Sequence, residues 1–346
     1  MPVNTPATAS ESHTHFLSLP DLAARPSGGA VIWANDELFA ERENLIKPAA
    51  SEYRPATFGH KGQVYDGWET RRRRDVGPNA CDAAIVRLGV PGIVRGVVVD
   101  TAWFTGNYPP QISVEATQIH GYPSVQELVE KAEWTTIVER SDVNGDTRNP
   151  FEVASSRRWT HVRLSIYPDG GVARFRVHGE GLLDPSFAEN MTVDLAALEN
   201  GGRITACSNM FYGSPNNLLL PGTSRTMGEG WETSRRRDTG NDWVQIRLAS
   251  QGVLQAVELD TSYFVGNAPG SARLSGKDGD GAWFDLLPTI DLLPDTRHRF
   301  LVDSDRPMTE ARLDIYPDGG MARLRLFGAL TDAGLQTVRD RWETST

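Results

Sequence analysis

The hydrophobic and polar residues of this chain follow patterns that are typical of β-strands. Residues 160–167, "THVRLSIY", alternate with period two, so that apolar side chains face one way and polar ones the other. Residues 93–100, "IVRGVVVD", and 253–260, "VLQAVELD", are apolar and β-branched, as buried strands are. Helical periodicity is scarce, and we expect a short helix within residues 120–134, "HGYPSVQELVEKAEW". The pattern predicts an all-β fold with few short helices.

Four sequence blocks occur twice in the same order, which indicates an internal duplication. The segment "DLAARPSGG" from Asp21 matches "DLAALENGG" from Asp194 at a shift of 173 residues, and three further blocks match at shifts of 163, 160 and 149. Residues 65–75 and 228–238 share 8 of 11 identities, and the last block shares 12 of 17. A period of this length indicates that a whole domain was duplicated, and not a solenoid.

The blocks define the expected domain organisation. We expect a first repeat at 16–180, a connector at 181–193 and a second repeat at 194–330. Residues 1–15 are predicted to be a flexible tail, and residues 331–346 a C-terminal tail. The shift falls along the chain because the first repeat carries 10 extra residues between the first two blocks, 3 more before the third and 11 more before the fourth.

The sequence Tyr-Pro-Asp-Gly-Gly separates two strands near the end of each repeat. Proline presets φ, aspartate accepts backbone hydrogen bonds, and glycine supplies a positive φ. We therefore expect a β-hairpin with a short turn, in which Asp169 and Asp318 bind backbone N–H groups. Many short strands joined by turns predict an antiparallel β-sandwich or jelly roll in each repeat.

Composition and charge narrow the class of protein. The chain has 346 residues, enough for two domains, and a net charge of −10. No apolar run approaches the roughly 20 residues that a membrane helix needs, and the first residues lack the features of a secretory signal. Cys81 and Cys207 lie far apart in the sequence, which favours reduced thiols in a cytoplasmic protein without a membrane partner.

Each repeat carries a run of arginines although the chain is acidic overall. The first run ends in Arg72, Arg73, Arg74 and Asp75, and its middle arginine aligns with Arg236. In an extended chain these side chains alternate between two faces, so they do not all line one pocket. Nucleic-acid binding is disfavoured because one short cluster is not a basic face. Two roles stay open: an arginine–aspartate lattice that links strands, and the binding of a small carboxylate by paired hydrogen bonds.

A polar loop follows the buried strand in both repeats. The segment "DTAWFTGN" in the first repeat matches "DTSYFVGN" in the second. Polar side chains on a loop that a rigid sheet holds in place are typical of binding sites. The candidates for substrate binding are therefore Asp100, Thr101, Asn107, Asp260 and Asn267. The alternative is that the Asp and Thr side chains close a turn.

Candidate acid–base groups are concentrated in the first repeat. His161 aligns with Glu310, and His120 lies in a region that only the first repeat has. Because histidine titrates near neutral pH, and because Glu69 lies beside the arginine run, these three are candidates for general acid or base. The alternative is that the histidines are ordinary surface or strand residues. The sequence has no familiar catalytic or cofactor motif and no metal-ligand spacing, which leaves a divalent metal open.

Taken together, these motifs resemble the allantoicase (allantoate amidinohydrolase) family. The resemblance rests on "GWETRRRRD" with "GWETSRRRD", on "DTAWFTGNYP" with "DTSYFVGNAP", and on the doubled "IYPDGG", and it covers residues 16–330. It implies two jelly-roll repeats similar to galactose-binding or discoidin modules, and assembly into a homo-oligomer. It also implies a hydrolase that converts allantoate and water to ureidoglycolate and urea in purine catabolism.

The residues themselves suggest how such a substrate would be bound. Arg73 or a neighbour would hold the carboxylate, and Asp100 with Asn107 would bind a ureido arm. His161, Glu69 or His120 would transfer protons. Because the blocks persist in both repeats, one site and two sites per chain both stay open. The rival function is a non-catalytic tandem β-sandwich that binds a small molecule or carbohydrate on aromatic side chains.

Overall fold

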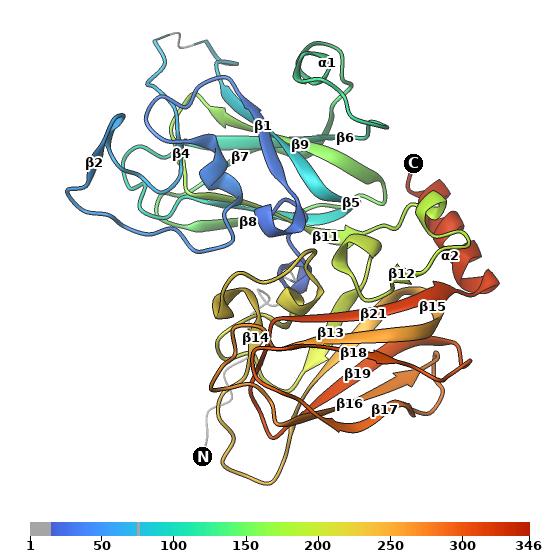
Figure 1. Ribbon diagram of the computed structural model, residues 1–346. Coiled ribbons are helices and arrows are strands. Elements are labelled where there is room, and N and C mark those ends of the chain that lie inside the picture. The colour runs from blue at the N-terminus through green and yellow to red at the C-terminus, as the bar shows by residue number, and fades with distance from the viewer. Residues whose placement is uncertain (1–14, 75–76) are drawn as a thin grey trace, which may run out of the picture. The chain divides into compact units, whose positions relative to one another are not determined.

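The computed structural model describes residues 15–74 and 77–346 and divides the chain into two compact units, Met1–Glu180 and Gly181–Thr346. Each unit is built mainly of antiparallel strands (Figure 1). The prediction of two tandem β-sandwich repeats with few short helices is confirmed. Most of the predicted N-terminal tail lies outside the described residues, and a 3-10 helix, His15–Ser18, begins at its last residue. Among the described helices, none has the length and apolar character that crossing a membrane requires.

Unit 1 contains one large sheet and two small ones. In the described part, the large sheet has seven strands in the order β1-β5-β9-β6-β7, with β8 and β11 also paired to β5. Its strands are β1 (Ala30–Ala34), β5 (Asp82–Asp100), β6 (Gln111–Thr117), β7 (Thr135–Asp142), β8 (Arg148–Glu152), β9 (Arg158–Tyr167) and β11 (Arg174–Gly181). The small sheets pair β4 (Trp68–Glu69) with β10 (Gly171–Val172), and β2 (Phe58–Gly59) with β3 (Gly62–Gln63).

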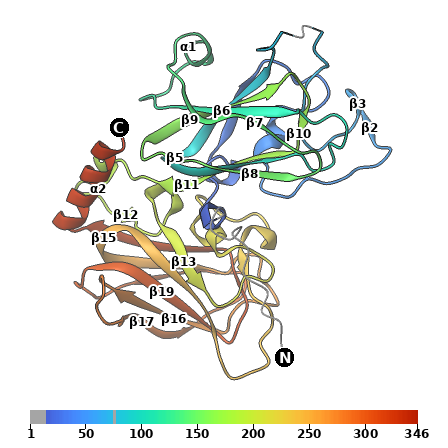
Figure 2. The ribbon, with the colours of Figure 1, turned by 180° about the vertical axis from the view of Figure 1, so that it is seen from behind.

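The long strand β5 belongs to both layers of the sandwich. Its first half pairs with β1 and β9, in the register Asp82↔Ile166, and its second half pairs with β8, in the register Asp100↔Arg148. The two halves therefore have different neighbours, as expected where one long strand contributes to both layers of a sandwich. The predicted buried strand 93–100 is the second half, and its residues Val97–Val99 are almost completely buried. The view from behind shows β8 and β11 beside this half (Figure 2).

Unit 2 repeats this arrangement. Its described strands are β12 (Val193–Asp194), β13 (Arg203–Cys207), β14 (Trp231–Glu232), β15 (Asp242–Asp260), β16 (Ser271–Lys277), β17 (Phe284–Asp291), β18 (Arg297–Leu301), β19 (Met308–Tyr316), β20 (Gly320–Met321) and β21 (Arg323–Leu330). The strand β15 corresponds to β5: it pairs with β13 and β19 along its first half and with β18 and β21 along its second. The duplication in the sequence is therefore a duplication of topology.

The helices are short, apart from one near the C-terminus. The α-helices are α1 (Val125–Glu130) and α2 (Asp332–Thr344) in the described part, and the 3-10 helices beyond residue 18 are η2 (Arg25–Ser27), η3 (Arg42–Ile46), η4 (Pro185–Phe187), η5 (Leu198–Asn200), η6 (Pro215–Leu219) and η7 (Met227–Glu229). The helix α1 falls where the sequence predicts one, and Ser124 caps it. The C-terminal segment 331–346 holds α2, whose Val338 packs against Leu183 and Ala188 of the connector.

The Tyr-Pro-Asp-Gly-Gly turn does not form the predicted hairpin. In the described part, β9 and β11 each pair with β5 and not with one another, so the turn carries the chain from one layer of the sandwich to the other. In unit 2, β19 and β21 likewise pair with different halves of β15. The local sequence pattern predicts two strands and a turn, but it does not show that each strand pairs with a third strand far away in the sequence. Gly170, at φ 142, has a backbone conformation that favours glycine.

Phe104 lies in a closely packed part of unit 1. A Cβ atom added at Gly171 would collide with Cδ1 of this buried ring. We expect Gly171→Ala to lower the free energy of unfolding by about 1–3 kcal/mol, because the ring or the strand must shift. Gly106→Ala is the control, since a Cβ there meets nothing within 4 Å. Urea denaturation of the two variants measures the difference, and equal stabilities would contradict this account of the packing.

Candidate active site

The arginine run of unit 1 is fixed by bonds to its own sheet. The backbone N–H of Arg73 donates to Asp169 Oδ2 at 2.7 Å, which is the backbone bond predicted for that aspartate. Its Nη1 donates to Asp82 Oδ1 at 2.6 Å and to the Cys81 carbonyl at 2.9 Å. The Arg73 side chain therefore already has a carboxylate partner, which agrees with the arginine–aspartate lattice, one of the two roles that the sequence left open.

Unit 2 has the same lattice. The N–H of Arg236 donates to Asp318 Oδ2 at 2.7 Å, and its Nη1 donates to Asp242 Oδ1 at 2.8 Å. The Arg236 side chain also pairs with Asp238 at 3.0 Å. Because both repeats contain these bonds, the linking of strands is sufficient to account for the repeated arginines and for the aspartates of both turns.

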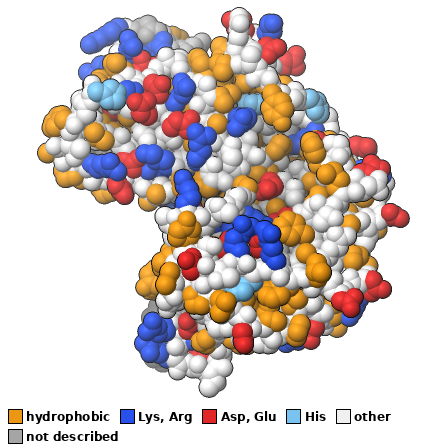
Figure 3. Space-filling model, in the orientation of Figure 1, with side chains coloured by type: hydrophobic (Ala, Val, Ile, Leu, Met, Phe, Trp, Pro, Cys, Tyr) orange, Lys and Arg blue, Asp and Glu red, His pale blue; other side chains and the backbone are white. Residues whose placement is uncertain are grey.

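Of the remaining arginines of the run, Arg71 pairs with Asp36 and the other two have exposed side chains. Arg72 and Arg74 are exposed, and neither forms a hydrogen bond or ion pair with another described residue. Asp75 lies outside the described residues. On the face of the molecule in Figure 3, basic and acidic side chains are interspersed over unit 1. Arg72 and Arg74 are thus accessible cations, whereas Arg73 is only partly exposed.

The loop after β5 uses two of its predicted site residues to close a turn. Asp100 Oδ1 accepts the Ala102 N–H at 2.9 Å. The hydroxyl of Thr101, which is fully buried, donates to the carbonyls of Asn144 and Thr147 at 2.6 and 3.0 Å. In unit 2, Asp260 accepts the Ser262 N–H at 2.8 Å, and this aspartate is itself buried. These contacts are those of the turn-closing alternative.

A carboxyl–amide pair lies beside this turn in each unit. Asn107 Nδ2 donates to Glu69 Oε1 at 2.7 Å, and Asn267 donates to Glu232 at the same distance. Burial raises the pKa of the Glu69 carboxyl, although the Asn107 bond opposes this. Glu69 Oε2 is buried and has no hydrogen-bond partner within the described structure. A carboxyl that keeps its proton to a higher pH than usual, and has one unused oxygen, is suited to proton transfer.

His161 lies at the other end of the sheet. His161 pairs with Arg87, whereas Asp82, the partner of Arg73, pairs with Ile166. His161 and Ile166 are five residues apart on β9, which is about 17 Å in an extended strand. Its Nδ1 lies 2.9 Å from the Thr160 hydroxyl. Burial, with a smaller contribution from the charge of Arg87, lowers the pKa of His161 to about 4. The imidazole is therefore neutral near pH 7.

This lowered pKa predicts a pH dependence of stability. Unfolded His161 binds a proton below its ordinary pKa of about 6.5, whereas the folded group stays neutral down to about 4, so stability is lost as the pH falls through this window. We expect the loss to be roughly 3 kcal/mol and His161→Gln to remove it. His120→Gln, at an exposed position, should leave the slope of urea-unfolding free energy against pH unchanged. An unchanged slope in His161→Gln would refute the assignment.

The predicted site residues therefore fall into two groups. Glu69, Asn107 and the arginine run lie together at the turn 168–171: Gly171 pairs with Glu69 and donates to the Asn107 carbonyl, and Asp169 accepts the Arg73 N–H. His161 and His120 lie towards the opposite end, because Thr117 at the end of β6 pairs with His161. The structure does not bring the histidines to Glu69.

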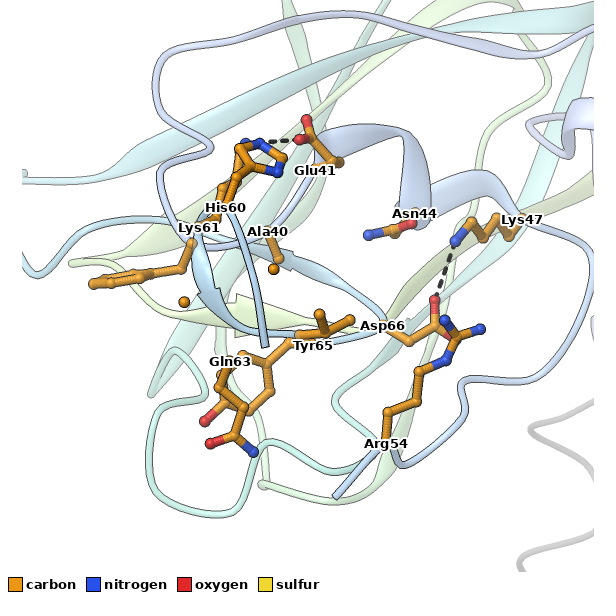
Figure 4. A pocket seen from close by; sticks show the side chains of 14 residues that line it. Ala40, Glu41, Asn44, Lys47, Arg54, His60, Lys61, Gln63, Tyr65 and Asp66 are labelled. Atoms are coloured by element: carbon orange, nitrogen blue, oxygen red, sulfur yellow. Dashed lines mark hydrogen bonds and ion pairs between the residues drawn. The ribbon is translucent and has the colours of Figure 1, made fainter. Parts of the chain in front are cut away.

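A pocket that was not predicted from the sequence lies next to the first group. It is a cavity of about 190 Å³ between η3 and the β2–β3 hairpin, lined by residues 39–41, 44, 47, 54 and 59–66. In the close-up of Figure 4, Lys61 with Glu41, and Lys47 with Asp66, stand at opposite ends, and Tyr65 and Gln63 border the space between them. We call this cavity the hairpin pocket. Most of its lining residues lie in the part of the first repeat that has 10 extra residues. This difference in length between the repeats was the sequence feature that could have pointed to the pocket.

The hairpin pocket is connected to Glu69. The Tyr65 ring lines the pocket and stacks on Phe104, with ring centroids 5.7 Å apart. Burial and then the nearby charge of Glu69 raise the pKa of Tyr65. The Glu69 carbonyl also accepts N–H bonds from Phe39 and Ala40 of the pocket wall, at 3.2 Å each. Glu69 thus lies directly behind the wall of the pocket.

Possible metal ligands and the two thiols are the remaining candidates for chemistry in the described part. No three His, Cys, Asp or Glu side chains lie there in an arrangement that could hold a metal ion. Cys81 and Cys207 are free thiols, and burial raises the pKa of both, which favours the unreactive protonated form.

The architecture and the comparisons together define the class of this chain. Two consecutive β-sandwich units of one topology, the first with a pocket lined by charged, polar and apolar side chains, make it a protein of duplicated sandwich repeats. A family model described as "Allantoicase repeat" matches residues 20–182 and 193–331. The chain therefore belongs to the allantoicase family.

Individual relatives agree with this membership. A "Probable allantoicase" of Nocardia farcinica is 61% identical over 91% of this chain and 95% of its own length. The "Allantoicase" of Dictyostelium discoideum is 41% identical over 90% of this chain and 88% of its own. The crystal structure of the allantoicase of Saccharomyces cerevisiae has a TM-score of 0.81 at 32% identity, and covers 93% of this chain and 98% of that one.

Proposed function

We infer that this chain is an allantoicase, which hydrolyses allantoate to ureidoglycolate and urea. The observation that carries this function is the 61% identity to a probable allantoicase over nearly the whole chain, with both repeats matched by the family model. In this reaction the bond from the central carbon to one ureido nitrogen breaks, and a bond to a water oxygen forms. The departing nitrogen takes up one proton and the water loses one, so a group that can hold a proton beside the substrate is required.

Unit 1 offers such a group in Glu69. Its buried carboxyl has a raised pKa, and the unpartnered Oε2 is free to take part in proton transfer. Arg73, which the sequence suggested for the substrate carboxylate, already binds Asp82, so this role falls more readily to another cation. The roles of Asp100, Thr101 and Asn107 as binding groups compete with the turn-closing and carboxyl-binding bonds that they already make.

The rival function is binding without catalysis on an aromatic platform. Trp68 and Phe104 are buried in the core, whereas Trp103 is about half exposed and its Nε1 donates to Ser51 O at 2.9 Å. The side chains of a shared platform would have to be exposed together, and these are not. A urea-release assay with allantoate separates the two functions, because a binding module would release no urea.

We further propose that the enzyme works as a homo-oligomer in the cytoplasm. The proposal of a homo-oligomer is supported by the resemblance of the repeat motifs to the family. The proposal of a cytoplasmic location is supported by the two free cysteines, which lie far apart in the sequence, and by the role of allantoate as an intermediate of nitrogen metabolism. Light scattering of the purified enzyme would give the mass of the particle in solution. A mass equal to that of one chain would contradict the oligomer.

A further inference from the structure

We propose that the hairpin pocket is the substrate site, that it accepts a small ureido carboxylate, and that Arg54 pairs with the carboxylate. This inference rests on the proposed function and adds to it the location, the anchoring residue and the number of sites per chain. The pocket belongs to unit 1 alone, and each of its lining residues lies between positions 39 and 66.

The charge of the pocket suits a small anion. Its lining includes three fixed cations, Lys47, Arg54 and Lys61, and two carboxylates, Glu41 and Asp66, so it carries one excess positive charge (3 − 2 = 1). The Lys61 ammonium lowers the pKa of Glu41. Burial acts to raise the pKa of Asp66, but hydrogen bonds from Arg174 and the Glu52 N–H leave it lowered. Both acids are therefore ionised near neutral pH, and the excess positive charge persists.

Arg54 is the cation that is available to a ligand. Lys61 is held by Glu41 at 2.9 Å and by the Glu37 carbonyl at 2.7 Å, and Lys47 pairs with Asp66 at 3.3 Å. Arg54 pairs with Glu52 at 3.2 Å, in an ion pair whose two side chains are more than half exposed. Exposed pairs of this kind are weak. A guanidinium can thus exchange Glu52 for the carboxylate of a ligand, which it binds with two parallel hydrogen bonds.

Neutral polar groups complete the pocket. Within the described part of the chain, the side-chain polar atoms of His60, Gln63 and Tyr65 form no hydrogen bond with another residue. A ureido group has N–H donors and a carbonyl acceptor, and the Gln63 amide can accept from one and donate to the other. The Tyr65 and His60 side chains supply further hydrogen-bonding atoms at the same cavity. The volume of about 190 Å³ suits a short-chain acid and not an oligosaccharide.

Unit 2 has no counterpart of the hairpin among its described elements, because β14 follows η6 and η7 with no strand between them. The first repeat carries its 10 extra residues in this part of the alignment. At the corresponding surface of unit 2, Phe211 and Tyr212 are 65% and 67% exposed. We therefore infer one substrate site per chain.

The kinetic test compares two exposed arginines. Arg54→Ala should raise KM for allantoate roughly 10- to 100-fold, the range expected for the loss of one charge-assisted pair. Arg225→Ala is the matched control: Arg225 pairs with Glu229 on the surface of unit 2 and should leave KM unchanged. Equal KM values for Arg54→Ala and the unaltered enzyme would overturn the proposal.

A second measurement does not depend on turnover. In a large excess of allantoate, amide hydrogen exchange in residues 58–66 should slow in the unaltered enzyme and in Arg225→Ala, but not in Arg54→Ala. If the unaltered enzyme releases urea but shows no such protection, and if Arg54→Ala leaves KM unchanged, the hairpin pocket is not the substrate site, although the proposed function still holds. An unaltered enzyme that releases no urea would instead refute the proposed function.

Discussion

Glu69→Gln should lower kcat for allantoate hydrolysis by roughly 10²- to 10⁴-fold, the contribution typical of a general acid or base. The glutamine keeps the size of the side chain, and its oxygen can still accept the 2.7 Å bond from Asn107. It loses only the ability to exchange a proton. KM should change little, because Glu69 stands behind the pocket wall, where it would exchange its proton with the substrate through an intervening water and not hold the substrate itself.

Unit 2 provides the control for this substitution. Glu232 accepts the same bond from Asn267 at the same distance, so Glu232→Gln removes an equivalent carboxyl from the repeat that lacks the hairpin. We expect Glu232→Gln to retain kcat. Equal losses in both variants would indicate a structural role for the pair or two active sites, and an active Glu69→Gln would exclude Glu69 from proton transfer.

The pH dependence of kcat provides a second measure of Glu69. If Glu69 donates the proton, activity requires the protonated carboxyl and falls as the pH rises through a pKa that burial has raised above 4.5. The Glu69→Gln variant should lack this limb of the profile. A limb that persists in the variant would assign it to another group.

Arg174→Met should cause the largest loss of stability among the buried charges of unit 1. The guanidinium is almost fully buried, pairs with Asp66 at 2.7 Å and donates to the carbonyls of Ala49 and Asp66 at 2.9 Å each. Removing one partner of such a buried pair costs about 3–5 kcal/mol. Because these bonds hold the back of the hairpin pocket, KM for allantoate should also rise. Urea denaturation and steady-state kinetics measure the two effects.

The corresponding arginine of unit 2 is less well paired and gives the comparison. Arg323 Nη1 donates to the Glu229 carbonyl at 2.7 Å, but the Glu229 carboxylate binds Arg225, and Arg323 Nε has no hydrogen-bond partner among the described residues. Burial lowers the pKa of Arg323 to about 10, the direction expected of an incompletely compensated charge. Arg323→Met should therefore lower the free energy of unfolding by clearly less than Arg174→Met does. A larger loss in Arg323→Met would show that the pairing of these two arginines does not determine their contributions to stability.

Much of the fold could be predicted from the sequence because the duplication provides an internal comparison. Period-two alternation at 160–167 and the apolar run at 93–100 both correspond to strands, β9 and the end of β5. The hairpin predicted at Tyr-Pro-Asp-Gly-Gly was wrong, because β9 and β11 pair with β5. Local sequence shows that a chain turns, but not which distant strand it meets.

The site could be predicted only in part. Residues that recur in both repeats, such as Arg73, Asp100 and Thr101, were predicted to bind substrate. The hydrogen bonds that they form within the sheet and its turns also explain why both repeats have them. The hairpin pocket lies where the repeats differ, and its residues come from a stretch without periodicity or motif. Its position depends on how that stretch folds back over η3, which no local pattern specifies.

The central claim is that allantoate binds in the hairpin pocket of unit 1. A crystal structure of the Glu69→Gln variant soaked with allantoate tests it most directly, since slow turnover should keep the substrate intact. We predict one molecule per chain between η3 and the β2–β3 hairpin, with its carboxylate on Arg54. Allantoate bound in unit 2, or at any place in unit 1 away from residues 39–66, would contradict the claim.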